Sequence, residues 1–279
     1  MVHKSKNIEV SDTAFVTCAF RKLNERLSQD TYAKLWENEK ADAILKDYIE
    51  AVSTEEIDTH CIRNRFFLET FKTLITDSKI DVIINFGAGF SMYPFLLPDH
   101  ITYIDIDQDN LISYKSQFIR EWNTQDILPR RTIEYIGVDF KLDYESFLNY
   151  KLKTLIKGKR TFILIEGVLF FLNRTETERL FSFFDAIQHT GDYIGSVSYN
   201  ETIKQTEAYN RLLSYANKGV VDASNNGFQL IEDAFYQDLQ NYRLIDHQDY
   251  FSSSKRYNHN PKNAVNHILN EHFYILQKD

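Results

Sequence analysis

Short runs of apolar, largely β-branched residues alternate with segments of helical spacing through the middle of the chain, and this alternation restricts the fold more than any other feature. The runs cover residues 81–86, 102–107, 131–138, 161–166 and 193–199. Strands of a buried parallel sheet have this continuous apolar character, and the helices between them cover both faces of the sheet. The sequence therefore predicts an α/β fold with a mostly parallel sheet.

The two ends of the chain differ from this middle part. Up to about residue 75 the apolar spacing is helical, with a first helix capped by Ser11 or Thr13 and two more over about 31–48 and 58–75. Near the other end, 242–249 and 272–277 are expected to be strands joined by a polar segment, which suits a reversed edge strand.

We therefore predict a Rossmann-like fold with an N-terminal helical cap. The cap is expected over residues 1–75 and the Rossmann-like core over 76–279, with a helical insertion near 201–239. The cap and the insertion are expected to roof a substrate pocket.

Composition excludes several classes of protein. The net charge of −8 argues against a general nucleic-acid binder, which usually has a basic excess. The most apolar stretch, 162–172, is too short to cross a bilayer and contains Glu166. Cys18 and Cys61 are too few for a disulfide framework or a zinc site, so no metal is expected. The first ten residues lack the apolar region of a secretory signal, so we expect a cytoplasmic protein without a membrane partner.

Chemically useful residues follow the predicted strands at the point where each strand ends. Ligands bind outside the carboxyl ends of the strands in open α/β sheets. In strand order, these residues are Gly87, Ala88 and Gly89, then Asp105 and Asp107, then Asp139 and Phe140, then Glu166, and finally Tyr199.

Each of these residue types can contact a particular part of an adenosyl sulfonium ligand. Glycines let the backbone approach the ligand closely, and an acid such as Asp107 can accept both ribose hydroxyls. Asp139 can accept from an adenine amino group, while Phe140 can pack on the ring. Glu166 can face the amino end of a methionine moiety.

Arg63 offers a guanidinium for the methionine carboxylate through two parallel hydrogen bonds. Simpler interpretations remain open: Asp107 as a helix N-cap, Asp139 as a turn residue, and Arg63 as a surface charge. Glu166 is harder to dismiss, because a carboxylate within an apolar run is costly unless it is paired.

A nicotinamide dehydrogenase is the main competing α/β interpretation. Its fingerprint has glycine at the first, third and sixth positions, but the sixth position counted from Gly87 is Met92. No P-loop sequence follows the strand, and neither a zinc-protease nor a nucleophile-elbow motif occurs.

The strand-end segments resemble those of the leucine carboxyl methyltransferase family, whose bacterial relatives include O-methyltransferases of secondary metabolism. Similar segments run from about residue 11 to 200. They are Ser11–Ala14 with Arg21, Arg63–Arg65, Asn85–Gly89, Tyr103–Asp107 with Lys115, Gly137–Asp139 and Glu166–Leu172.

The resemblance implies a class I methyltransferase fold with S-adenosyl-L-methionine as cofactor. It implies that Arg63, Gly87, Asp107, Asp139 and Glu166 contact the cofactor, with Asp105 second to Asp107 for the ribose. One segment departs from the family pattern: Ser91-Met92-Tyr93 stands where the family usually has Asp-Thr-Arg. That loop borders the methionine end of the site, so the departure bears on the substrate class and on activity.

The leading hypothesis is a methyltransferase that transfers a methyl group to a carboxylate or hydroxyl of a small molecule, or to a C-terminal carboxyl. A hydroxyl acceptor needs a base or a hydrogen-bond acceptor, for which Tyr199 and His247 are the first residues to test. A non-catalytic scaffold that binds a partner is the alternative, and the negative charge disfavours RNA methylation. The sequence specifies neither the acceptor nor the oligomeric state.

Overall fold

The computed structural model describes residues 12–140, 142–217 and 227–279. Ser11, a predicted cap, lies outside these ranges. The strands are β1 Val82–Phe86, β2 Thr102–Gln108, β3 Ile133–Val138, β4 Thr161–Ile165, β5 Tyr193–Tyr199, β6 Tyr242–Asp249 and β7 Glu271–Lys278. The α-helices are α1 Asp12–Leu23, α2 Glu25–Ser28, α3 Glu39–Ala51, α4 Glu56–Thr76, α5 Tyr93–Leu96, α6 Asp109–Thr124, α7 Glu145–Leu155, α8 Arg174–Ile187, α9 Glu207–Ala216, α10 Asp233–Gln237 and α11 Tyr250–Arg256. Short 3-10 helices are η1 Ala33–Trp36, η2 Leu169–Phe171, η3 Glu201–Gln205 and η4 Val265–His267.

The strands form one sheet in the order β3-β2-β1-β4-β5-β7-β6. Neighbours from β3 to β5 pair in parallel, whereas β7 runs antiparallel to both β5 and β6. The expected mostly parallel sheet with a reversed strand near its edge is confirmed. The strand order reverses between β1 and β4, and ligands of such sheets bind outside the carboxyl ends at this point.

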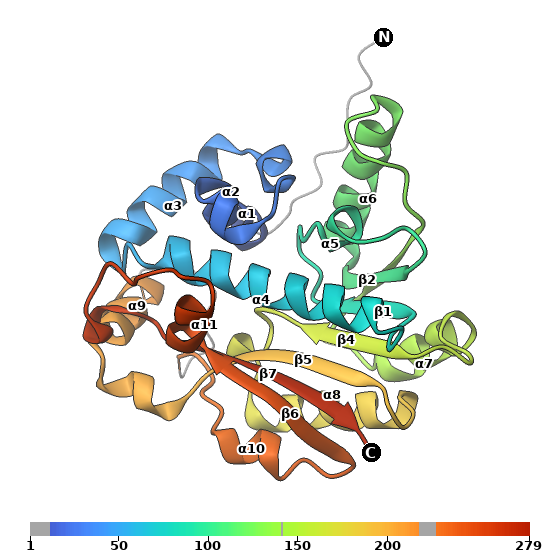
Figure 1. Ribbon diagram of the computed structural model, residues 1–279. Coiled ribbons are helices and arrows are strands. Elements are labelled where there is room, and N and C mark those ends of the chain that lie inside the picture. The colour runs from blue at the N-terminus through green and yellow to red at the C-terminus, as the bar shows by residue number, and fades with distance from the viewer. Residues whose placement is uncertain (1–11, 141, 218–226) are drawn as a thin grey trace.

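Helices cover both faces of the sheet, as the predicted alternation requires. The long helix α4 lies across one face (Figure 1), where Phe71 packs on Phe162 and Phe66 on Phe273, with ring centroids 4.8 and 5.2 Å apart. On the other face, α7 and α8 share a core cluster with alternate strand residues such as Ile163 and Ile165. Both faces therefore bury continuous apolar surface, which is the main stabilising contribution.

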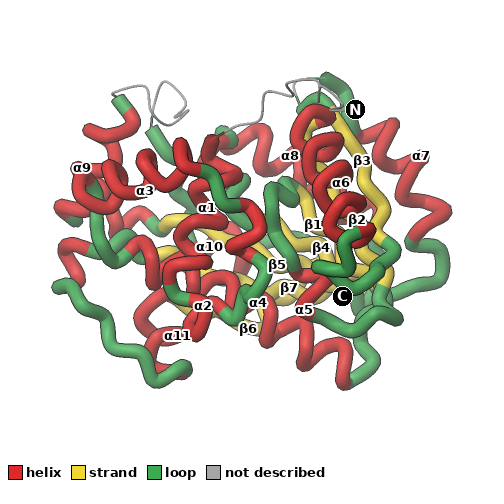
Figure 2. Tube along the Cα trace, turned by 90° about the horizontal axis from the view of Figure 1, so that it is seen from above, coloured by secondary structure: helices red, strands yellow, loops and turns green. Residues whose placement is uncertain are grey.

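The N-terminal helices reach over the loop that follows β1. Trp36 of η1 stacks on Phe90 with ring centroids 4.1 Å apart, and Phe15 of α1 contacts the same ring at 4.7 Å. Seen from above, α1, α3 and α9 gather on one side of the molecule and α6 and α7 on the other (Figure 2). The N-terminal helices are thereby held beside the tips of the central strands.

One helix prediction in this region is wrong. The range 31–48 is not one helix, because the short η1 ends at Trp36 and α3 begins at Glu39. The side chain of Asn38 accepts hydrogen bonds from the backbone N–H groups of Lys40 and Ala41, which caps α3 and separates the two elements.

The C-terminal third contains short helices before its last two strands. The segment near 201–239 contains η3, α9 and α10, although 218–226 of it lie outside the described residues. Cys18 and Cys61 are both free and buried. No helix among the described residues combines the length and the apolar character needed to cross a membrane. The division between cap and core at residue 75 stays a prediction.

Candidate active site at the strand tips

A cavity of about 710 Å³ opens where the parallel strands end. This volume is within the range of small-molecule sites. Residues that follow each of the five parallel strands β1 to β5 line it, together with side chains of α1, α3, α4 and α9. The predicted site residues among them are Arg63, Gly87, Ala88, Gly89, Asp107, Phe140, Glu166 and Tyr199.

The cavity has two ends of different construction. We call the end formed by Gly87, Ala88, Gly89, Asp107, Phe140 and Glu166 the strand-tip half. We call the end formed by Phe20, Tyr48, Glu56, His60, Leu212 and Phe228 the helical half. Arg63 of α4 and Tyr199 of β5 line the same cavity.

The glycine turn requires glycine for its backbone shape. Gly87 and Gly89 have φ angles of +74° and +45°, a region that other residues rarely adopt. A Cβ atom on Gly87 would lie 2.2 Å from the Val168 side chain, whereas one on Gly89 would meet nothing within 4 Å. The turn therefore presents bare backbone to the cavity.

Asp107 is fixed beside this turn at the end of β2. Its Oδ2 accepts a hydrogen bond from the Gly89 N–H at 2.8 Å, and Oδ1 accepts from the Gln108 N–H at 2.7 Å. Burial raises the pKa of Asp107, and these two N–H groups oppose that shift. Each carboxylate oxygen keeps a further lone pair with which it can accept from a ligand hydroxyl.

Asp105 and Asp139 do not line the cavity. Asp105 is buried, and its Oδ2 lies 2.8 Å from Nζ of the equally buried Lys115. The expected second choice for the ribose is therefore an internal ion pair: Asp105 lies two residues before Asp107, on the same face of β2 but further from the strand tip, where Lys115 of α6 reaches it. Asp139 is exposed, next to the lining residue Phe140.

Arg63 joins two carboxylates below the centre of the cavity. Its Nε donates to Glu166 Oε1 at 2.9 Å, and its Nη1 donates to Glu271 Oε1 at 2.6 Å. All three side chains are at most 10% exposed. Arg63 is therefore no surface charge, and Glu166 is paired, as a carboxylate inside an apolar run must be.

This network is short of positive charge. One guanidinium faces two carboxylates, and burial raises the pKa of Glu271 although Arg63 opposes the shift. Oε2 of Glu271 is buried without a hydrogen-bond partner among the described residues. Such an atom is costly in an empty site and suits a cationic ligand group.

The segment that departs from the family pattern is anchored to the same network. The Tyr93 hydroxyl donates to Glu166 Oε2 at 2.8 Å. Ser91 Oγ accepts from Asn85 Nδ2, and the Met92 sulfur accepts from Trp36 Nε1 at 3.2 Å. The departing segment thus retains a polar contact with Glu166 through a tyrosine.

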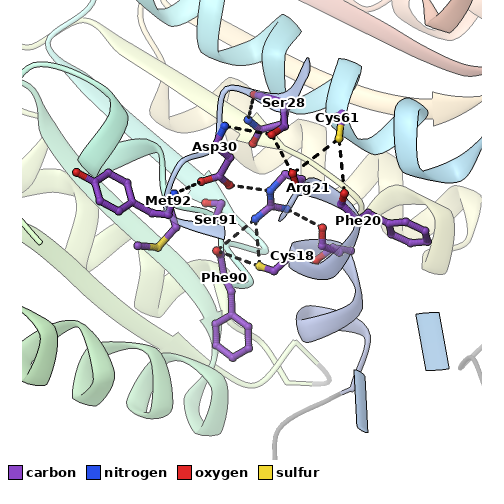
Figure 3. Close-up of polar contacts among 12 residues, drawn as sticks. Cys18, Phe20, Arg21, Ser28, Asp30, Cys61, Phe90, Ser91 and Met92 are labelled. Atoms are coloured by element: carbon purple, nitrogen blue, oxygen red, sulfur yellow. Dashed lines mark hydrogen bonds and ion pairs between the residues drawn. The ribbon is translucent and has the colours of Figure 1, made fainter. Parts of the chain in front are cut away.

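Arg21 of α1 fastens the N-terminal helices to the glycine loop. Its Nε donates to Asp30 Oδ2 at 2.9 Å, and its Nη2 lies within hydrogen-bond distance of Cys18 Sγ and the Phe90 carbonyl (Figure 3). Both ends of the Arg21–Asp30 pair are buried. The cavity therefore has a wall that depends on contacts between segments far apart in the sequence.

The two candidates for a base lie in different places. Tyr199 lines the cavity and packs on Phe170, and burial next to Glu56 raises its pKa well above the usual value. It is therefore a protonated hydroxyl and no base at neutral pH. His247 does not line the cavity. Its Nε2 lies 3.0 Å from His272 Nδ1, and its ring stacks on Tyr274.

Sequence reasoning missed Glu271, Glu56 and His60, and it named Tyr93 only as part of the segment that departs from the family pattern. A signal existed for Glu271: a reversed strand brings its first residue to the ligand edge, and Glu271 pairs with Tyr199, the last residue of β5. For Glu56 and His60, the signal was their spacing of seven and three residues before Arg63, which places all three on one face of a helix.

Known proteins resemble this chain in sequence and in fold. "Putative S-adenosyl-L-methionine-dependent methyltransferase" proteins of Mycobacterium ulcerans and Mycobacteroides abscessus are 22% and 25% identical, each over 67% of this chain. The matches span 63% and 66% of those relatives' lengths. The solved structure of a methyltransferase-like protein from Thermobifida fusca superposes with a TM-score of 0.69 at 11% identity, covering 100% of both chains.

A family model provides the most specific comparison. The model of the leucine carboxyl methyltransferase family matches residues 13–185, which is more than half of the chain. The match includes Arg63, the glycine turn, Asp107 and Glu166. The chain therefore belongs to the leucine carboxyl methyltransferase family.

Proposed function

We propose that this protein is an S-adenosyl-L-methionine-dependent O-methyltransferase that acts on a small molecule. The observation that carries the proposal is the convergence of the glycine turn, Asp107 and the Arg63 network on one cavity. Family membership and the names of the relatives support the methyl donor. The family description names a carboxyl group, from which we carry over the oxygen acceptor but not leucine.

The strand-tip half suits the adenosyl part of the donor. In this proposal the Asp107 carboxylate accepts from the ribose hydroxyls, while Phe140 packs on the adenine. Phe140 is held by Phe86 and Tyr144, with ring centroids 5.2 and 5.6 Å away, so an aromatic wall is already in place. Asp139 stays a prediction for the adenine amino group.

The Arg63 network suits the methionine part. Nη2 of Arg63 has no hydrogen bond to any described residue and is proposed to donate to the carboxylate of the donor. The free Oε2 of Glu271 would accept from its ammonium group. The excess of carboxylates in the network fits a ligand that carries both an ammonium and a sulfonium.

The donor itself supplies an electrophilic methyl group, so the chain's task is to position the reactants and exclude water. The buried residues around Arg63 form a site with little access to solvent. An oxygen acceptor would then enter the helical half, opposite the strand tips.

Calorimetric titration of the full chain with S-adenosylhomocysteine tests the proposal. We expect S-adenosylhomocysteine to bind at one saturable site and S-adenosylmethionine to compete for that site. An absence of heat with both compounds would contradict a methyltransferase and favour a scaffold that binds a partner.

A further inference from the structure

The helical half carries a histidine in a defined orientation. His60 lines the cavity from α4, one helical turn before Arg63. Its Nδ1 lies 2.9 Å from the backbone carbonyl of Glu56, and its ring stacks on Phe20 with centroids 4.2 Å apart. These two contacts fix both the position and the plane of the imidazole.

The same hydrogen bond sets the tautomer. A carbonyl oxygen only accepts, so Nδ1 carries the proton and Nε2 keeps its lone pair. The structure gives Nε2 no hydrogen bond to any described residue. Nε2 is thus a hydrogen-bond acceptor on the edge of the ring opposite the helix backbone.

The cavity offers no free cation to a carboxylate acceptor. Within the described part of the chain, the lining cations are three arginines, and each is already paired: Arg21 with Asp30, Arg63 with Glu166 and Glu271, and Arg179 with Glu145. The remaining Nη2 of Arg63 is assigned to the carboxylate of the methyl donor in the proposed function, so it is not available to the acceptor. From other elements, Arg21 of α1 acts on His60 electrostatically, and Tyr48 of α3 packs on the same Phe20 ring as His60.

The helical half is also neutral near pH 7. Burial, together with Arg63 and Arg21, lowers the pKa of His60 well below its usual value, while the hydrogen bond to Glu56 opposes this shift. Burial and the nearby Glu271 raise the pKa of Glu56 to about 8, so this carboxyl group is mostly protonated. Apolar neighbours such as Leu212 and Phe228 complete the surface.

We propose that the acceptor is a neutral compound methylated at a hydroxyl group, and that His60 Nε2 accepts the proton of that hydroxyl. This inference rests on the proposed function. As the acceptor oxygen forms its bond to the methyl carbon, the carbon–sulfur bond breaks and its electron pair stays on the sulfur. The hydroxyl proton moves to Nε2 and leaves to solvent after the products depart.

The first test compares matched acceptor probes. The full chain saturated with S-adenosylhomocysteine is titrated with 2-naphthol and 2-naphthoate, and with phenol and benzoate. We expect the hydroxyl member of each pair to bind at least about tenfold more tightly, which corresponds to about 1.4 kcal/mol. Equal binding, tighter binding of the carboxylates, or no binding of either hydroxyl compound would overturn the inference. Binding of S-adenosylhomocysteine in the same sample would leave the proposed function standing.

The second test replaces the histidine. His60→Asn keeps an N–H donor for the Glu56 carbonyl but has no atom at the position of Nε2. Turnover of the hydroxyl probe that binds best should fall about 100-fold or more, while the affinity for S-adenosylhomocysteine changes less than about threefold. His100→Asn, at an exposed histidine, is the matched control and should leave both unchanged.

The pH profile separates a base from a packing residue. The wild-type rate should fall at acidic pH as His60 becomes protonated, and the rate of His60→Asn should lack this acidic limb. A variant that keeps both the wild-type rate and the acidic limb would show that His60 does not accept the proton.

Discussion

The two halves of the cavity are built from different kinds of sequence. The strand-tip half comes from short segments that follow consecutive strands, and its carboxyl groups are hydrogen-bonded to backbone N–H groups or to Arg63. The helical half comes from α1, α3, α4 and α9, and its polar residues Glu56 and His60 are held neutral by burial. In the proposed assignment, the parallel sheet fixes the donor site, whereas the helices above the sheet shape the acceptor site.

Arg63 borders both halves, so its loss should have the largest effect. Arg63→Ala leaves Glu166 and Glu271 buried without their partner, which should lower the free energy of unfolding by about 3–5 kcal/mol. Urea denaturation monitored by circular dichroism measures this loss. Arg65→Ala is the matched control, because Arg65 pairs with the partly exposed Glu69 and should cost about 1 kcal/mol or less. If both variants lost the same free energy of unfolding, the buried Arg63 network would not stabilise the fold more than a partly exposed ion pair does.

The neutral character of the helical half predicts a pH effect on stability. Since the folded-state pKa of Glu56 is about 8 against an ordinary 4.5, the folded chain keeps a proton that the unfolded chain has lost between these values. Stability should therefore fall as pH rises through this interval. Between pH 5 and pH 7, the free energy of unfolding of the wild type should fall by about 3 kcal/mol relative to that of Glu56→Gln, which lacks the titrating group. Parallel stability curves for the two proteins would show that Glu56 is charged in the folded state.

Asp107 tests the strand-tip half. Asp107→Ala should weaken the binding of S-adenosylhomocysteine about 10- to 100-fold, because the ribose loses charged hydrogen bonds worth about 1.5–3 kcal/mol. The melting temperature should change little, since the lost contacts within the chain are to two backbone N–H groups. Asp139→Ala is the comparison at the exposed neighbouring strand end and should change the affinity less. An Asp107→Ala protein with wild-type affinity would remove this residue from the site.

Tyr93 gives the smallest expected effect. Tyr93→Phe keeps the ring and removes the hydroxyl that donates to Glu166, which should cost about 1 kcal/mol of stability. Chemical denaturation measures it, with Tyr32→Phe as a control. If Tyr93→Phe lowered the free energy of unfolding as much as Arg63→Ala does, the segment Ser91-Met92-Tyr93, and not Arg63, would be the main stabilising part of the network.

The strand-tip half could largely be predicted from the sequence. Glycine turns and acids that directly follow apolar runs are local signals, and the geometry of a parallel sheet brings them to one edge. The pairing of Asp105 with Lys115 could not be read in this way, since it depends on where α6 places Lys115 against β2. Asp107, two residues later on the same strand, lies near the tip where the cavity opens.

The helices of the helical half were expected, as the cap and the insertion that roof a pocket, but its side-chain contacts could not be predicted because they join distant segments. Glu271 meets Arg63 across 208 positions of sequence, and His60 faces Phe20 of another helix. The predicted base His247 has a polar environment of its own on β6, away from the cavity. A histidine in the middle of a helix carries no local signal of function, and only the packing of α1 against α4 reveals its role.

A crystal structure of the full chain with S-adenosylhomocysteine would show which half of the cavity holds the adenosine. We expect the ribose hydroxyls about 3 Å from the Asp107 carboxylate, the methionine carboxylate at Arg63, and the open side of the sulfur facing His60. A ligand with its adenosine beneath α3 and α9, or bound outside this cavity, would contradict the assignment of the two halves.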